Sequence, residues 1–167
     1  MGERRLIVDL ARQRLTVLDD GVEGRSYPIS TSSKGAGEQN GSGCTPRGRH
    51  MIRAKIGRGL PSGAVFVGRR PTGEVHSDEL GERFPDRDWI LTRILWLSGL
   101  ERGRNRLGNV DSMRRYIYIH GMPDSEPVGG PGSSGCIRMR NANVIDLFEA
   151  VEAGTPVDIV EDRGRSP

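Results

Sequence analysis

The stretch Tyr116–Met139 reads Y-I-Y-I-H-G, then a loop rich in glycine, proline and serine, then S-S-G-C-I-R-M. The alternation of aromatic and β-branched residues in its first part predicts a strand near 115–120 that ends at His120. The glycine-rich loop is free enough to fold Cys136 back toward that strand. A thiol must lose its proton to attack a carbonyl, and a nearby imidazole can accept that proton. His120 and Cys136 are therefore the candidate base and nucleophile of a thiol-dependent acyl transfer.

A second interpretation of the same pair is a thiol in the core and an imidazole on the surface. For an arbitrary cysteine and histidine this is the commoner situation, because reactive and inert cysteines differ only in their environment. Closeness in sequence does not establish contact, since the cysteine and histidine of thiol enzymes are usually neighbours in space. The residues that flank His120 and Cys136 favour the catalytic interpretation.

These flanking motifs resemble the catalytic signature of the YkuD-type L,D-transpeptidase family. In that family a strand ending in I-H-G is followed, after a glycine-rich loop, by S-H-G-C, and here Ile119–Gly121 and Ser133–Met139 occupy those places. Upstream, Leu6–Tyr27 resembles the opening hairpin of the family and Thr45–Gly48 its T-P-x-G segment. The resemblance extends over roughly residues 4–160. It implies a mostly β fold, a β-sandwich of mixed strands with one short helix in the C-terminal half, packed near the catalytic strand.

The resemblance also implies roles for individual residues. Cys136 would attack the donor carbonyl, His120 would take and later return the proton, and the carbonyl of Gly121 would hold the other ring nitrogen of His120. Ser134 stands where the family signature has a histidine, so that second imidazole is missing here. From residue types alone, the backbone N–H groups of Gly135 and Cys136 are candidates for an oxyanion hole, because glycine permits a tight turn that aims them at one point.

Four further residues are candidates for substrate binding. Arg138 follows the cysteine by two positions, so in an extended strand it projects to the same side and can clamp a carboxylate through two hydrogen bonds. For Ser133 and Ser134, local hydrogen bonds within the loop are as well supported as a role in the site. Tyr118 alternates with isoleucine neighbours, and its ring either packs in the interior or lines a cleft.

Composition argues against several other classes of protein. A chain of 167 residues fits one domain, here residues 1–167, and 24 glycines with 10 prolines favour short strands and turns. The 25 basic and 22 acidic residues are scattered, without the basic runs and interleaved aromatics of nucleic-acid grooves, so no nucleic-acid partner is expected. The three histidines and two cysteines are well separated, and neither a metal nor another cofactor is expected.

Local patterns predict strands near 5–10, 14–19, 25–30, 50–56, 64–68, 90–97, 115–120, 136–140 and 156–160. One helix is predicted over about 143–153, where Val144–Val151 carries an apolar stripe, Asn143 can cap the start and Gly154 can end it. Charged and turn residues dominate 69–88. This composition predicts a loop there, a candidate lid over the cleft.

The resemblance implies a peptidoglycan stem tetrapeptide or muropeptide as the donor, cut between diaminopimelate and the terminal D-alanine. Leu6–Leu10 is too short for a signal-peptide core, and no apolar stretch reaches the ~20 residues of a membrane span. The chain is therefore expected in the cytoplasm if it is complete, and in the periplasm or cell envelope if a leader was removed. In the cytoplasm water is the natural acceptor, which favours an L,D-carboxypeptidase of muropeptide recycling. The alternatives are an L,D-transpeptidase that cross-links peptidoglycan and a non-catalytic muropeptide-binding module.

Overall fold

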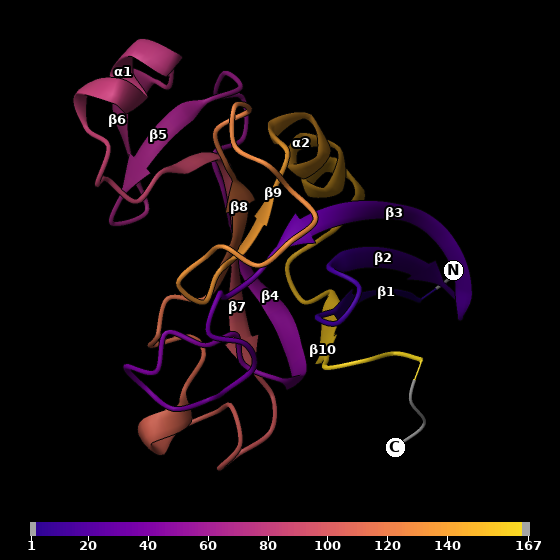
Figure 1. Ribbon diagram of the computed structural model, residues 1–167. Coiled ribbons are helices and arrows are strands. Elements are labelled where there is room, and N and C mark those ends of the chain that lie inside the picture. The colour runs from indigo at the N-terminus through magenta and orange to yellow at the C-terminus, as the bar shows by residue number, and fades with distance from the viewer. Residues whose placement is uncertain (1–2, 165–167) are drawn as a thin grey trace.

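The computed structural model describes residues 3–164 and is built mainly of β-strands (Figure 1). The predicted domain 1–167 includes Met1, Gly2 and residues 165–167, which lie outside the described residues. The strands are β1 (Arg4–Asp9), β2 (Arg14–Asp19), β3 (Val22–Ser30), β4 (Gly48–Ile56), β5 (Ala64–Val67), β6 (Arg70–Val75), β7 (Ile90–Gly99), β8 (Tyr118–Gly121), β9 (Ile137–Met139) and β10 (Pro156–Val160). The helices are α1 (Asp78–Arg83), α2 (Asn141–Ala150) and a 3-10 turn at Gly108–Val110. Within residues 3–164, no helix has the length and apolar character needed to cross a membrane.

The ten strands form one hydrogen-bonded sheet in the order β4-β10-β1-β2-β3-β9-β8-β7-β5-β6. β4 also pairs with β7, so the strands from β4 round to β7 close into a barrel-like ring, and the β5–β6 hairpin projects from it (Figure 1). Most pairs are antiparallel, whereas β1–β10 and β8–β9 are parallel. The predicted mostly β fold of mixed strands is confirmed, and ring closure joins the layers of the predicted sandwich into a continuous wall.

Alternation of apolar and polar residues sends one face of each strand into a common core. In β1, Leu6 and Val8 are fully buried, whereas Arg4 is exposed. The same core cluster takes in the buried face of α2, including Leu147 and Phe148. Removing such side chains from water contributes roughly 25 cal/mol per Å² of apolar surface. The helix is thereby fixed against the sheet next to β7 and β8, as the sequence predicts.

The ends of α2 differ from the prediction. The helix begins at Asn141 and ends at Ala150, and the residue before it, Arg140, makes no capping bond through its side chain. Asn143 is therefore not the N-cap, and Gly154 does not end the helix. The reason for the early end is that Val151 takes an extended conformation and its side chain is buried in the core.

The segment 69–88 is not the predicted loop. It contains β6, which pairs with β5, and α1, where the Ser77 hydroxyl accepts the N–H of Leu80 at 3.1 Å. β6 ends the sheet, so it has one paired side only, and all of its residues except the half-buried Glu74 are exposed. Because no face of β6 is buried, its sequence lacks the apolar alternation by which strands are identified.

Two strands of the signature are also shifted from their predicted bounds. β8 begins at Tyr118 and continues through Gly121, so His120 lies inside the strand and not at its end. Tyr116 lies outside it in the left-handed region, with φ of 56°, and its ring is exposed. β9 is confined to Ile137–Met139, which leaves Cys136 in the turn that enters the strand.

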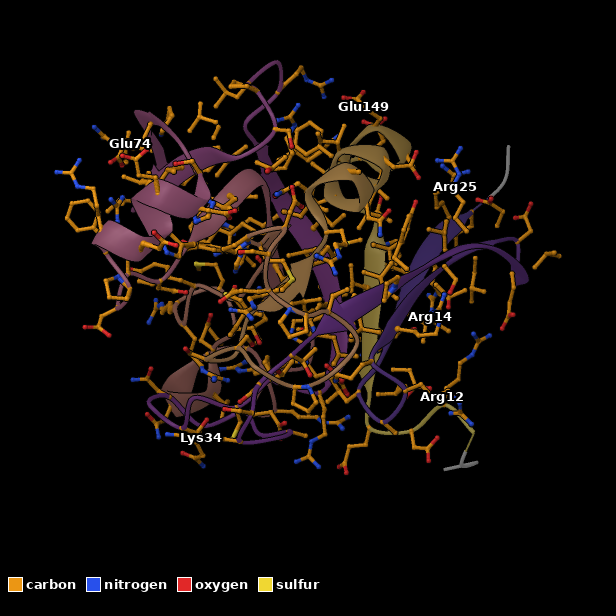
Figure 2. The ribbon with its side chains drawn as sticks, turned by 45° about the horizontal axis from the view of Figure 1, so that its top comes forward. Arg12, Arg14, Arg25, Lys34, Glu74 and Glu149 are labelled. Atoms are coloured by element: carbon orange, nitrogen blue, oxygen red, sulfur yellow. The ribbon has the colours of Figure 1, made fainter. Side chains whose placement is uncertain are left out.

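Charged side chains are distributed around the outside of the molecule. Figure 2 shows Arg12, Arg14 and Arg25 beside the β1–β3 strands, with Glu149 on α2 and Glu74 on the projecting hairpin. Ion pairs between such groups are mostly exposed, and each contributes only about 0–1 kcal/mol. They serve solubility more than they determine the fold.

Strand β4, which closes the ring by pairing with β7, contains a buried histidine. His50 in β4 is fully buried, with Nε2 2.8 Å from the Ser112 hydroxyl and Nδ1 3.0 Å from the carbonyl oxygen of Gly48. Desolvation lowers the pKa of His50 to about 4. The ring is therefore neutral at neutral pH in the folded protein.

We expect the free energy of unfolding to fall as the pH drops from about 6.5 toward 4. The unfolded ring of His50 takes up a proton near its ordinary pKa of about 6.5, whereas the folded ring does so only near 4, so acid favours the unfolded state by up to ~3 kcal/mol. Urea unfolding at several pH values checks this. The His50→Gln variant should lose less of its free energy of unfolding over this pH range. An identical loss in both proteins would contradict the lowered pKa of His50.

Candidate active site

The two halves of the signature meet in the parallel pairing of β8 with β9. Ile119 pairs with Ile137, and His120 pairs with Arg138. Because side chains alternate across a strand, His120 and Arg138 share one face of the sheet, and Cys136, two residues before Arg138, joins them. Ile119 and Ile137 point the other way and are fully buried in the core. Register and core packing therefore fix which residues face outward together.

That outward face borders a cavity of about 500 Å³. Its lining includes the predicted site residues Tyr118, His120, Ser133, Ser134, Cys136 and Arg138. The lining also includes residues that the sequence did not single out, namely Gly68, Arg69, Asp88, Ile90, Arg115 and Tyr116. The structure thus brings the candidate nucleophile, base and carboxylate-binding residue to one hollow. Gly121 and Gly135, whose backbone groups are also candidates, do not line the cavity themselves. Gly121 follows His120 and Gly135 precedes Cys136, and both of these neighbours line it.

His120 is buried and held in one orientation by its neighbour. Its Nδ1 lies 2.6 Å from the carbonyl oxygen of Gly121. A carbonyl can only accept, so Nδ1 carries the proton of the neutral ring and Nε2 is left with its lone pair. Burial lowers the pKa of His120, while the Gly121 carbonyl and the charge of Asp88 act in the opposite direction. A neutral imidazole with a free Nε2 is suited to accept a proton.

The sulfur of Cys136 contacts two backbone groups. The N–H of Tyr118 donates to Sγ at 3.4 Å, and the thiol donates to the carbonyl of Tyr116 at 3.4 Å. Desolvation raises the pKa of the thiol to about 12, although the Tyr118 N–H and the charges of Arg115 and Arg138 oppose this. The resting thiol is therefore neutral. Rotation about the Cβ–Sγ bond redirects its proton without moving the sulfur.

The turn before Cys136 is fixed by hydrogen bonds on both sides. Gly135 has φ of 125°, and a Cβ there would lie 3.1 Å from the carbonyl oxygen of Cys44. Its carbonyl accepts the Thr45 hydroxyl at 2.9 Å, and its N–H donates to the Ser133 hydroxyl at 3.2 Å. Ser133 in turn donates to the carbonyl of Cys136 at 2.6 Å. The Ser133 hydroxyl and the Gly135 N–H are thus engaged within the turn.

The remaining predicted residues differ in how firmly they are held. Arg138 is largely buried, and its Nη2 lies 3.9 Å from Oε2 of Glu126. The Nε of Arg138 has no hydrogen-bond partner within residues 3–164. Ser134 is exposed at the cavity. The hydroxyl of Tyr118 accepts a hydrogen bond from Arg69 at 3.0 Å. Of these, Arg138 combines a largely buried side chain with a place in the lining of the cavity.

A polar contact behind Gly121 supports the histidine and has no signal in the sequence. Thr92 lies in a bulge of β7 opposite β8, with φ of 75°, which is strained for a β-branched residue. Its hydroxyl donates to Oδ1 of Asn141 at 2.5 Å and accepts the N–H of Gly63 at 2.9 Å. Asn141 and Thr92 both abut Gly121, whose carbonyl holds His120. Three distant elements therefore fix the position of that carbonyl.

Arg115 is a second supporting residue that sequence reasoning missed. It donates to the carbonyl of Cys44 at 2.6 Å and to the carbonyls of Gly37 and Glu38 at 3.2 Å. These bonds attach the 34–45 loop next to the turn that precedes the candidate nucleophile. The T-P-x-G resemblance identified one end of this loop, but nothing local to Arg115 indicates its partners.

We expect Gly121→Ala to lower the free energy of unfolding by ~1–3 kcal/mol, the usual range for overpacking a core. A Cβ at this position would overlap Asn141 and lie 2.6 Å from the carbonyl oxygen of Leu91. Urea unfolding measures the change. Gly130→Ala is the matched control because a Cβ there meets no atom within 4 Å. Equal stability of the two variants would contradict the close packing behind His120.

We also expect the rate of Cys136 alkylation by iodoacetamide to rise about tenfold per pH unit between about pH 7 and 10. Below its pKa of about 12 the thiol gains thiolate in proportion to hydroxide, and only the thiolate reacts. Peptide mass mapping follows Cys136 separately from Cys44. A rate that is high and independent of pH below about pH 7 would instead show a preformed thiolate–imidazolium pair.

Comparison with known proteins identifies the family of the sequence and structures of similar fold. The sequence model of the YkuD family, described as the L,D-transpeptidase catalytic domain, matches residues 3–159. A protein of Bacillus subtilis (strain 168), YqjB, provisionally named an L,D-transpeptidase, is 48% identical over 48 residues, which are 29% of this chain and 27% of that protein.

Two solved structures have a similar fold. L,D-transpeptidase 3 from Mycobacterium tuberculosis, in complex with a faropenem-derived adduct, matches with a TM-score of 0.59 and 18% identity over 96% of this chain and 61% of that chain. An L,D-transpeptidase from Mycobacterium smegmatis matches with a TM-score of 0.56 and 18% identity, over 95% of this chain and 59% of that chain. At this identity the likeness shows the fold alone, and the present chain spans about three fifths of either structure. The match across residues 3–159 shows that the chain belongs to the YkuD family of L,D-transpeptidase catalytic domains.

Proposed function

We propose that this protein transfers the acyl group of a peptidoglycan stem tetrapeptide through Cys136, cleaving the bond between diaminopimelate and D-alanine. The observation that carries the proposal is the shared face of β8 and β9, where Cys136, His120 and Arg138 line one cavity of about 500 Å³. A thiol, a base with a free ring nitrogen and a guanidinium are the groups needed to cleave a peptide that ends in a carboxylate.

The chemistry follows from the positions of these groups. As the donor carbonyl approaches Sγ, the thiol proton passes to Nε2 of His120, and the new C–S bond leaves an oxyanion that the backbone N–H of Cys136 can bind. The oxyanion collapses, the C–N bond breaks, and His120 returns the proton to the departing amine of D-alanine. The proposed role of Arg138 is to bind the carboxylate of that leaving group, and its pairing with His120 in the strand register supports this role.

Water is the proposed acceptor for the thioester, which makes the activity that of an L,D-carboxypeptidase on small muropeptides. Water attacks the thioester carbon and gives a proton to Nε2 of His120, and His120 returns that proton to the sulfur as the C–S bond breaks, which restores the thiol and the neutral ring. The cavity of about 500 Å³ has the size of a site for one short peptide. The transpeptidase alternative is supported by the names of the relatives, and there the acceptor is an amine.

Arginines take up part of the task that a second imidazole would have at Ser134. The charges of Arg115 and Arg138 and the N–H of Tyr118 all lower the pKa of Cys136 against the effect of desolvation. They stabilise a thiolate once substrate begins to draw the proton away. The thiol can therefore be activated although serine replaces histidine at position 134.

Mass spectrometry after incubation with a purified tetrapeptide muropeptide tests the proposal. We expect conversion to the tripeptide with release of D-alanine, and a loss of at least about 10³-fold in rate for Cys136→Ala, since removal of a nucleophile leaves only binding and oxyanion stabilisation. A cross-linked dimer as the product would establish the transpeptidase instead. Undiminished binding by Cys136→Ala combined with no turnover in the wild type would establish a binding module.

A further inference from the structure

Arg69 lies at the tip of the β5–β6 hairpin, and its side chain extends back toward the barrel-like ring of strands. Gly68 and Arg69 have φ of 57° and 65°, the conformation of a tight two-residue hairpin turn. The guanidinium carbon lies 4.4 Å from the ring centre of Trp96 and 5.0 Å from that of Tyr116. Nη1 donates to the hydroxyl of Tyr118 at 3.0 Å. Aromatic faces and one hydrogen bond thus hold a planar cation at the cavity that contains the thiol.

The charge of this guanidinium is not neutralised inside the protein. Among residues 3–164, Arg69 forms no ion pair with a carboxylate, and its strongest electrostatic partner is the Tyr118 hydroxyl. The one acidic residue of the cavity lining, Asp88, acts on His120 and Cys136. A guanidinium has five N–H donors in a planar fork, so most of them remain for a ligand. The ligand that matches such a fork is a carboxylate.

Strand register decides which end of the substrate this carboxylate belongs to. Tyr118 contacts Sγ through its N–H, whereas Arg138 is paired with His120 farther along the strands. The leaving amine must lie next to His120, because His120 supplies its proton. The leaving group therefore occupies the side of His120 and Arg138. The acyl part, on the other side of the attacked carbon, must extend toward Tyr118 and Arg69.

We infer that Arg69 forms a second carboxylate-binding subsite, which selects donors with a free carboxylate on the acyl side of the bond that is cut. This inference rests on the proposed function, and it names the substrate class of the same site. A diaminopimelate side chain presents such a carboxylate, whereas its amide or a lysine side chain presents none. Arg69 would thus determine which diamino acid is accepted, and Arg138 would bind the leaving group.

Two tetrapeptides that differ only in a free or amidated side-chain carboxylate of diaminopimelate test the inference. For the wild type, we expect kcat/KM for D-alanine release to be about tenfold or more higher for the free acid, as one charge-assisted hydrogen bond would give. In Arg69→Met, the kcat/KM values for the free acid and for the amide should differ by no more than about twofold. The matched control is Arg70→Met at the exposed first residue of β6, directly after the turn, which should keep the wild-type ratio.

Binding to catalytically inactive protein provides a second readout. Calorimetry with Cys136→Ala, with and without Arg69→Met, should show the same preference for the free acid and the same loss of preference. If Arg69→Met keeps the wild-type ratio, or if the wild type does not distinguish the peptides, the inference is wrong. If no D-alanine is released, but the free acid binds more tightly than the amide and Arg69→Met removes that difference, the proposed turnover is wrong and the subsite is confirmed. If neither peptide binds, both are wrong.

Discussion

The parallel hydrogen bonding of β8 to β9 is the constraint on which the candidate site depends. It pairs His120 with Arg138 and places Cys136 on the same face, while Ile119 and Ile137 anchor the opposite face in the core. A shift of β9 by one residue would turn Arg138 away from His120 and take Ile137 out of the core. Burial of the isoleucines therefore specifies the geometry of the outward-facing groups, so that core packing and site assembly are one requirement.

Desolvation governs the chemical state of that site. It raises the pKa of Cys136 and lowers the pKa of His120, so both groups are neutral at rest. A neutral thiol is protected from adventitious reaction, and in the proposed mechanism the proton moves only when a substrate carbonyl is in place. Hydrogen bonds to the Gly121 carbonyl and within the Gly135 turn keep the ring and the sulfur oriented for that transfer. Arginines around the cavity then favour the charged state and an anionic substrate.

Features that depend on neighbours in sequence were predictable. The periodicity of the strands, the glycine turn and the spacing of His120 and Cys136 are local, and the structure brings these two residues to one cavity. Arg69, Thr92 and Arg115 were not identified, because their partners lie on elements far away in the chain. β6 was missed because an exposed edge strand carries no apolar alternation. Ser133 illustrates the remaining ambiguity, since its sequence neighbours do not indicate that its hydroxyl is engaged inside the turn.

Acylation by faropenem, compared between the wild type and His120→Gln, tests most directly whether the strand register makes His120 the base for Cys136. A β-lactam carbonyl requires the same attack by sulfur but needs no stem-peptide contacts, and a Mycobacterium tuberculosis relative has been solved with a faropenem-derived adduct. Intact-protein mass spectrometry should show an adduct on Cys136 that forms at least about a hundredfold more slowly in the variant, within the usual contribution of general base catalysis. Equal rates in the two proteins would contradict the account.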